Sequence, residues 1–264
     1  MTHIIGTVLE VQGLVKRYGD VVALSELTIS LRAGAALVLL GRNGAGKTTA
    51  LRCMAGLVRP SGGSVRVGGV DTRTDADAVR AQIGLMPEVP GLYERMSAPA
   101  YLDYFGAVYG LEEPERRARI GSLLRRFDLA AAGERWLGTF SKGMRQKVAL
   151  IRATLHQPRL ILADEPTSAL DPDSARRAWD YLRELQAGGA ALVICTHSMD
   201  EAQALAGTVG IMSAGRLLAA GDLDQLTAAA GLTARREVAL WPGLRDIYLA
   251  IVGEHLDGYE TRLA

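Results

Sequence analysis

The stretch from Gly41 to Thr49 reads GRNGAGKTT, and it limits the possible folds more than any other part of the chain. It matches the pattern G-x-x-x-x-G-K-[ST], with Gly46, Lys47 and Thr48 at the required distances from the first glycine. An apolar run at Ala36–Leu40 precedes it, and apolar residues follow it at helical spacing. A buried strand, a glycine-rich turn and a helix form the local structure in which such a loop binds phosphate. The sequence therefore predicts a phosphate-binding loop.

The residue types in this loop indicate how it would hold an anion. The glycines let the backbone curl, so that successive N–H groups point at one anion, and the helix N-terminus adds about half an elementary charge. Lys47 is placed to neutralise the β- and γ-phosphates of a nucleotide, and the Thr48 hydroxyl to hold Mg²⁺. The other predicted nucleotide contacts in the loop are Gly41, Asn43, Gly44, Ala45, Gly46 and Thr49. The alternative is a glycine-rich turn with a lysine that matches by chance.

Composition and charge narrow the classes of protein to which the chain could belong. Its 264 residues suffice for one large domain, or for a core domain with a subdomain. A formal net charge of +1 gives no bulk attraction to nucleic acid or to an anionic membrane. We expect no signal peptide and no membrane-spanning segment, because no apolar stretch of about 18 residues occurs. Cys53 and Cys195 lie in apolar segments, which predicts buried thiols in a reducing compartment.

The first third of the chain carries strand patterns. Val8–Leu14 and Val21–Leu31 are rich in β-branched residues and partly alternate, and a turn around Tyr18-Gly19-Asp20 joins them. Ser64–Gly68 is a further short strand after the loop helix. Tyr18 is an aromatic residue that could stack on a nucleotide base. Its spacing alone favours an ordinary tyrosine packed in a turn.

Residues 89–155 lack strand patterns, which indicates a helical insertion. An apolar stripe runs from Tyr101 to Tyr109, and Glu112–Phe127 is a second helix with several arginines on one face. We expect that basic face to be solvated rather than bound to nucleic acid. Ser141 is a natural N-cap for a third helix that ends near Leu155. A capped helix start can bind an anion, although a plain cap is the expectation from sequence alone.

Two later strands end in polar residues at one predicted edge of a parallel sheet. Leu160–Ala163 is followed by Asp164 and Glu165, and Ala190–Cys195 is followed closely by His197. Ligands bind at the carboxyl ends of the strands in open α/β sheets. Asp164 is placed there to hold Mg²⁺, and Glu165 to polarise a water aimed at the γ-phosphate. For His197, a role in the site and a structural role remain open.

In this order, the segments resemble the nucleotide-binding subunit of ATP-binding cassette (ABC) transporters, from about Val8 to Leu226. The resemblance implies an α/β fold, in which a P-loop NTPase (RecA-like) core with a mainly parallel sheet carries an N-terminal antiparallel β subdomain and an inserted α-helical subdomain at about 89–155. It divides the chain into an ABC ATPase domain, residues 1–226, and a short C-terminal extension, residues 227–264. The segment Leu244–Glu254 resembles the short helix common in such extensions.

Family motifs fall on particular residues of this chain. Tyr18 matches the adenine-stacking aromatic, Glu88 falls at the Q-loop, and Ser141 and Gly143 form the core of the signature motif. Asp171 belongs to the D-loop segment, and His197 matches the switch histidine. The resemblance implies that Glu165, His197, Glu88 and Lys47 act in catalysis, that Thr48, Asp164 and Glu88 hold the metal, and that Tyr18, Ser141, Gly143 and Asp171 complete the nucleotide contacts of the loop.

Several positions depart from the usual family pattern. Arg42 replaces a proline in the loop, Glu88 replaces a glutamine, and Ala169 replaces a D-loop glycine. Lys142 and Met144 replace a glycine and a glutamine of the signature. Pro87-Glu88 together with the sequence SKGMRQ resembles a bacterial exporter subgroup, in which the ATPase is a separate chain serving a membrane permease.

The resemblance also implies partners and a place of action. Two such subunits, in this case a homodimer, would face each other head to tail over two ATP with Mg²⁺ and drive an integral membrane permease from the cytoplasmic face of the cell membrane. Nucleic acid is not expected as a partner. One alternative is a soluble ABC ATPase acting on ribosomes or nucleic acid, but such proteins usually join two cassettes in one chain. The other is a P-loop GTPase or small-molecule kinase, for which segment 141–144 and His197 would be unusual.

Overall fold

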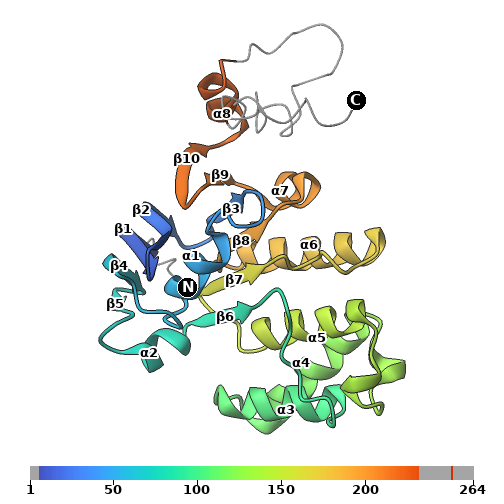
Figure 1. Ribbon diagram of the computed structural model, residues 1–264. Coiled ribbons are helices and arrows are strands. Elements are labelled where there is room, and N and C mark those ends of the chain that lie inside the picture. Colours follow the sequence, from blue (N-terminus) through green and yellow to red (C-terminus); the bar gives the residue numbers. More distant parts are fainter. Residues whose placement is uncertain (1–5, 232–250, 252–264) are drawn as a thin grey trace, which may run out of the picture.

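The computed structural model describes residues 6–231 and residue 251, and it contains two β-sheets flanked by helices (Figure 1). The first sheet has four strands in the order β2-β1-β4-β5, all paired antiparallel. Its strands are β1 (Thr7–Tyr18), β2 (Val21–Arg32), β4 (Gly62–Val67) and β5 (Val70–Asp71). This sheet is the predicted N-terminal antiparallel subdomain, although β1 extends further than the sequence pattern indicated.

The second sheet has six strands in the order β10-β9-β3-β8-β7-β6, and all but β10 pair in parallel. Its strands are β3 (Ala36–Leu40), β6 (Ile83–Met86), β7 (Leu160–Asp164), β8 (Ala191–Thr196), β9 (Thr208–Ser213) and β10 (Arg216–Gly221). Every residue of β3, β7 and β8 is buried, because helices or the first sheet cover both faces. Leu40 pairs with Thr196, and Asp164 with Cys195. The carboxyl ends of these three strands therefore lie level at one edge.

Helices divide between the two faces of this central sheet (Figure 1). The described helices are α1 (Lys47–Met54), α2 (Ala76–Arg80), α3 (Ala98–Val108), α4 (Glu113–Arg126), α5 (Lys142–Thr154), α6 (Pro172–Ala187), α7 (Met199–Leu205) and α8 (Leu223–Ala229). Strand β3 sends Leu37 and Leu39 into a core shared with α1 and the first sheet. Its alternate residues, Ala36, Val38 and Leu40, enter a second core with helices α3 to α7. The alternation of strand side chains thus joins two cores into one body.

The predicted helical insertion consists of α3, α4 and α5, and it does not have a core of its own. Val148 and Ile151 of α5 belong to the same core as Ile161 of β7 and Leu192 of β8. α5 therefore packs directly on the sheet that carries the acids at its edge. This contact places the predicted signature helix against the strands of the site.

The expectation that the arginine-rich face of α4 is solvated is wrong. Arg116 forms an ion pair with Asp103, with its Nε 2.6 Å from the carboxylate. Arg119 donates to the Leu155 carbonyl at 2.9 Å, and Arg126 binds both carboxylate oxygens of Glu184. These arginines hold α4 to α3, to the end of α5 and to α6. The sequence does not reveal which neighbouring acids and carbonyls a charged helix face meets, so the sequence pattern alone predicts exposure.

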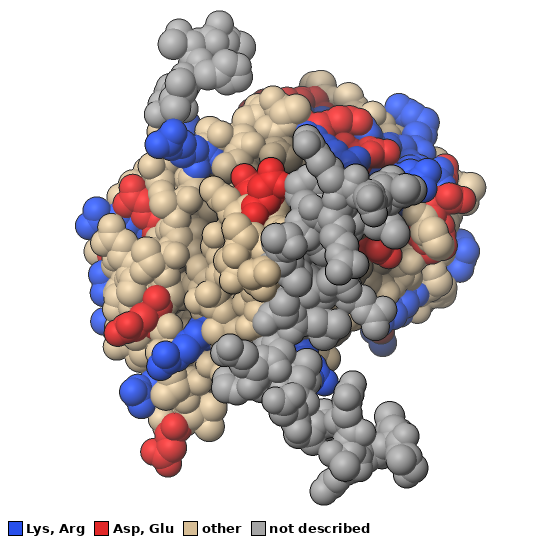
Figure 2. Space-filling view, turned by 90° about the horizontal axis from the view of Figure 1, so that it is seen from above, with Lys and Arg blue, Asp and Glu red and all other residues tan. Residues whose placement is uncertain are grey.

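Two remaining features concern the surface and the C-terminal part. In the view of Figure 2, basic and acidic side chains are interspersed over the described part of the surface. Among residues 6–231 and residue 251, no helix combines the length and the apolar character needed to cross a bilayer.

Helix α8 continues across the predicted boundary at residue 226. The helix predicted at 244–254 lies outside the described residues except for Ile251.

Candidate active site

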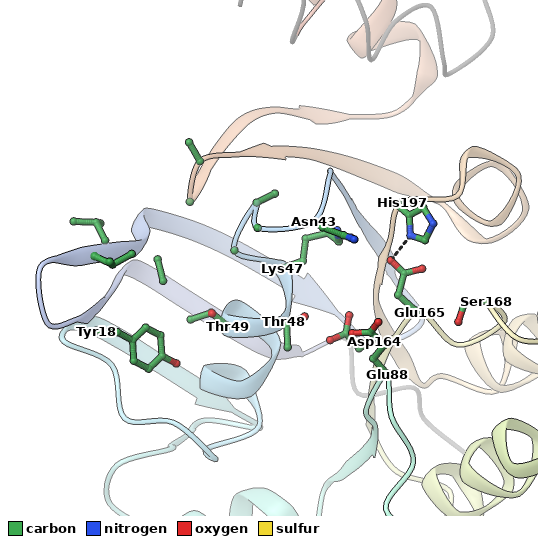
Figure 3. Close-up of a pocket in the computed structure, with 18 of the residues that line it drawn as sticks. Tyr18, Asn43, Lys47, Thr48, Thr49, Glu88, Asp164, Glu165, Ser168 and His197 are labelled. Atoms are coloured by element: carbon green, nitrogen blue, oxygen red, sulfur yellow. Dashed lines mark hydrogen bonds and ion pairs between the residues drawn. The ribbon is translucent and has the colours of Figure 1, made fainter. Parts of the chain in front are cut away.

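A cleft of about 710 Å³ opens at the carboxyl edge of β3, β7 and β8. Figure 3 shows Tyr18 at one end, Lys47 between, and the acids with His197 at the other end. The cleft is lined by Tyr18, Val21, Val22, Ala23, Asn43, Gly44, Ala45, Gly46, Lys47, Thr48, Thr49, Glu88, Lys142, Asp164, Glu165, Ser168, His197, Ala214 and Gly215. Most of the predicted site residues, distant in sequence, therefore line one cavity.

The loop between β3 and α1 has the backbone that phosphate binding requires. Gly44 and Gly46 have φ angles of 83° and 99°, in the left-handed region that favours glycine. A Cβ at Gly46 would lie only 2.6 Å from the Ala23 carbonyl oxygen. Helix α1 begins after Gly46 with no side-chain cap, so the N–H groups of its first turn are available to a ligand. Loop and helix end together form an anion site at the floor of the cleft.

The Lys47 side chain is buried and lies over this loop. Its ammonium donates hydrogen bonds to the Gly41 carbonyl at 2.5 Å and to the Arg42 carbonyl at 3.2 Å. These bonds hold a positive charge beside the N–H groups that face the cleft. A polyphosphate in the loop would meet the backbone dipoles and a positioned cation together.

Glu165 and His197 face each other at the opposite end of the cleft (Figure 3). The Glu165 carboxylate is buried, and its Oε1 lies 2.7 Å from His197 Nδ1. Its second oxygen accepts a hydrogen bond of 3.2 Å from the Thr196 hydroxyl. The imidazole is largely exposed, with 61% of its side-chain surface accessible. A buried carboxylate with both oxygens oriented, beside an accessible imidazole, can accept a proton from a water in the cleft.

Asp164 lies at the end of β7 among other acids. Burial raises the pKa of its carboxyl, a hydrogen bond with Thr48 opposes that rise, and the charges of Glu88 and Glu165 add to it. Because the carboxylates of Glu88 and Glu165 act on Asp164 together, a cation bound here would be stabilised by all three. Thr48, Asp164 and Glu88 offer hard oxygen ligands of the kind Mg²⁺ prefers. No group of three or more acidic, histidine or cysteine side chains that could hold a metal occurs among the described residues. Mg²⁺ sites with only one or two carboxylates are usual where phosphates supply the other ligands.

Tyr18 lies at the cleft rather than inside a packed turn. Its side chain is 47% exposed, and the Lys16 ammonium sits over the ring, 4.7 Å from the centroid. Val21 and Val22 continue the lining beside it. The sequence preference for an ordinary packed tyrosine is therefore wrong, since the ring is open to the cavity.

Four predicted site residues lie outside this cleft. Gly41 borders a neighbouring cavity of about 410 Å³ with His197. Ser141 caps α5, where its Oγ accepts from the Met144 N–H at 3.2 Å. Gly143 and Asp171 likewise do not line the cleft, and the Asp171 carboxylate caps α6 by accepting from the Ser174 N–H at 2.9 Å. Within one chain, Ser141 and Gly143 of the signature do not line the cleft with the phosphate loop, although Lys142 between them does.

Some residues at the cleft were not predicted from the sequence. Gly215, in the β9–β10 turn, donates its N–H to the Ala45 carbonyl at 3.0 Å and so supports the loop. Glu201, at the start of α7, does not line the cleft, but it is buried and its carboxylate accepts a hydrogen bond from the Thr167 hydroxyl at 2.6 Å. Neither contact has a local signal, because each depends on how distant segments pack.

The fold and this site define a P-loop ATPase: a strand, loop and helix cradle phosphate, and strand-end acids stand opposite. The family model for ABC transporters matches residues 24–168. The chain belongs to the ABC transporter family and is its ATP-binding, ATP-hydrolysing subunit.

The relatives it matches are ATP-binding proteins of such systems. The daunorubicin resistance ATP-binding protein DrrA3 of Streptomyces coeruleorubidus is 38% identical over 225 residues, covering 85% of this chain and 71% of the relative. The ABC transporter ATP-binding protein NatA of Bacillus subtilis is 41% identical over 205 residues, covering 77% and 83%. The Nod factor export ATP-binding protein I of Cupriavidus pinatubonensis is 34% identical, covering 83% and 67%.

Solved structures support the same assignment. An ATP-binding subunit of an ABC transporter has a TM-score of 0.86 and 32% identity, covering 93% of this chain and all of that one. The ATP-binding cassette MJ0796, a dimer bound to ADP and Pi, has a TM-score of 0.75, covering 81% of this chain and 97% of that chain. At 24% identity, the second likeness shows the fold alone.

Proposed function

We propose that this chain is the ATPase of an exporter, and that it works as a homodimer over two ATP with Mg²⁺ to drive a separate membrane permease. The observation that supports the pairing most strongly is the half-site found in one chain. The cleft has the loop, the acids and His197, whereas Ser141 and Asp171 lie elsewhere. In a head-to-tail pair, Ser141 of each chain would meet the nucleotide in the loop of the other. The nucleotide would then join the two chains, and hydrolysis would release them.

Within the cleft, each of this chain's residues has a definite proposed task. Lys47 and the loop N–H groups bind the phosphates, and Tyr18 stacks on the adenine. Glu165 accepts a proton from the attacking water, and His197 orients the Glu165 carboxylate through its 2.7 Å contact. Glu88, a carboxylate where relatives of this family usually have glutamine, faces the same cavity and senses the γ-phosphate. Asp171, in the D-loop segment outside the cleft, would contribute to nucleotide binding in the pair.

Thr48, Asp164 and Glu88 are the residues that would hold Mg²⁺. When bound, the ion neutralises phosphate charge. The carboxylates of Glu88 and Glu165 near Asp164 support this assignment.

An exposed surface on the helical insertion is the proposed contact for the permease. We call it the aromatic surface, and it consists of Tyr93, Tyr104, Val108 and Tyr109, which are between 37% and 64% exposed. Aromatic rings with a polar edge suit an interface with the cytoplasmic helices of a membrane protein. This contact would hold the chain at the inner face of the cell membrane. The names of relatives in drug resistance and Nod factor export support export as the direction.

Cross-linking in cells, followed by purification of the tagged full chain, tests the transport role. We expect a polytopic membrane protein as the cross-linked partner, and we expect Tyr104→Asp to lose it. Leu218→Asp is the matched control, because Leu218 is 43% exposed on β10, away from the aromatic surface. Capture of ribosomal proteins by the wild type, with no membrane protein, would contradict the proposal and favour a soluble ABC ATPase.

A further inference from the structure

Glu165 has a strained backbone that the surrounding structure must hold in place. Its φ angle is 50°, in the left-handed region that residues other than glycine rarely adopt. Such a conformation persists only where neighbouring contacts over-determine it. The Glu165 N–H donates to the Cys195 carbonyl of β8 at 2.8 Å. This bond fixes one side of the residue to the sheet.

A buried amide from another helix fixes the other side. Gln146 of α5 donates from Nε2 to the Glu165 carbonyl at 2.8 Å, and its side chain is only 1% exposed. The same carbonyl also accepts a longer bond, 3.3 Å, from the Ser168 N–H within the local turn. Removal of the Gln146 amide would therefore leave the carbonyl paired but no longer tied to α5. The Glu165 carbonyl is therefore satisfied without Gln146, and the main effect of the Gln146 contact is to hold Glu165 in position.

The first turn of α5 also touches the segment that follows Glu165. A Cβ at Gly143 would lie 2.9 Å from the Ala169 carbonyl oxygen, so the two backbones are in close contact. Ser141, Gly143 and Gln146 lie within one and a half turns of the same helix. Any displacement of the start of α5 is therefore passed to both ends of segment 165–169.

We propose that Gln146 is a positioning residue that makes the placement of Glu165 depend on what binds at the start of α5. This inference rests on the proposed function, in which Ser141 meets the nucleotide of the partner chain. The nucleotide bound by the partner chain would contact the start of α5 and fix the position of this helix. The hydrogen bond from Gln146 would then fix the position of Glu165 in the same chain. The two nucleotides of the dimer would then be coupled, so hydrolysis would depend cooperatively on ATP concentration.

The test measures ATP hydrolysis against ATP concentration for the full chain and its variants. For the wild type, we expect a Hill coefficient between one and two, the limit for two sites. Gln146→Leu removes the donor but keeps an apolar shape that the buried position can hold. We expect its kcat to fall about 10-fold and its Hill coefficient to approach one, because a misplaced catalytic group costs rate rather than nucleotide binding. Nucleotide affinity at the loop should change by less than about twofold. Gln146→Met keeps the length of the side chain but has no donor, so the same changes are expected.

Thr154→Val is the matched control, because Thr154 is also buried in α5 and its hydroxyl bonds at the far end of the helix, to the Leu150 and Ile151 carbonyls and to the Tyr181 hydroxyl. It should lower stability but keep the wild-type kcat and Hill coefficient. Wild-type kcat and cooperativity in Gln146→Leu, or equal losses in Thr154→Val, would overturn the role of Gln146. The proposed dimer is judged separately, by whether Glu165→Gln associates when ATP is added. If it stays monomeric and the wild type is not cooperative, the dimer and this inference both fail.

Discussion

Replacement of Glu165 by glutamine isolates the chemical step from binding. The two side chains have the same size, and the amide oxygen can still accept from the Thr196 hydroxyl. The substitution weakens the charge-assisted contact with His197, which lowers stability. It also removes the charge of one of the three carboxylates in the cleft, which raises stability. The charge of Glu165 is one cause of the raised pKa of Asp164, so its removal relieves repulsion. We therefore expect the free energy of unfolding to change by no more than about 1 kcal/mol.

The effect on rate should be much larger than the effect on stability. A positioned general base contributes about 10²- to 10⁴-fold, or roughly 3–5 kcal/mol of barrier at 1.36 kcal/mol per tenfold. Because Lys47 and the loop N–H groups lie at the other side of the cleft, ATP binding should stay within a few-fold of the wild type. The variant should therefore bind ATP and retain it.

Phosphate release at saturating ATP and Mg²⁺ measures this loss directly, with nucleotide affinity determined on the same samples. Asp180→Asn is the matched control, because Asp180 is a half-exposed acid on α6 that pairs with Arg183, away from the cleft. The control should hydrolyse ATP at the wild-type rate. Turnover of Glu165→Gln within about threefold of the wild type would refute its role as general base, since that loss is far below the scale expected for such a group.

Three further predictions test the loop, the packing and a partly buried histidine. Lys47→Ala should abolish ATP binding, because it removes the cation held over the loop; retained affinity in a fluorescent-nucleotide titration would count against the site. Gly84→Ala should lower the free energy of unfolding by about 1–3 kcal/mol or more, measured in urea, because its Cβ would lie 1.9 Å from the Ala153 carbonyl oxygen; an unchanged midpoint would show that β6 and α5 separate easily. Burial lowers the pKa of His156 to about 4 from 6.5, and its Nε2 lies 3.2 Å from the Ile83 carbonyl. The unfolded chain then binds the proton more tightly, so stability should fall as pH drops from about 6.5 towards 4, by up to about 3 kcal/mol from this group, and His156→Phe should flatten that part of the urea-midpoint profile.

The parts of the fold that the sequence predicted well have local signals. The loop is contiguous, so Gly41, Lys47 and Thr48 identify it without any knowledge of the packing. Asp164 and Glu165 follow a buried strand directly, and parallel strands bring their carboxyl ends to one edge. The β1–β2 hairpin also follows from strand pattern and turn residues. In each case, neighbours in the sequence are neighbours in the structure.

Other parts depend on contacts between segments that are far apart in the chain. Gln146 lies in a helix of ordinary amphipathic pattern, and only the packing of α5 on β7 shows that its amide reaches Glu165. Arg126 meets Glu184 across 58 positions of sequence, so a basic helix face was misjudged as solvated. Tyr18 appeared to be a turn residue because nothing local places the turn beside the loop. The packing of distant segments determines each of these contacts, and the pattern of a single segment does not predict it.

A mixing experiment tests the central claim, that each catalytic site is completed by a second chain. Lys47→Ala destroys the loop but leaves Ser141 intact, and Ser141→Arg does the reverse, so each variant alone should be nearly inactive. In an equal mixture, random pairing makes half of the dimers mixed, and each mixed dimer has one complete site, which sets a ceiling of about a quarter of the wild-type rate. Because the second site holds no nucleotide, the coupling proposed through Gln146 should lower the recovered rate below that ceiling, but the rate should still exceed that of either variant alone. No recovery on mixing, or full activity of Ser141→Arg alone at every protein concentration, would contradict the account.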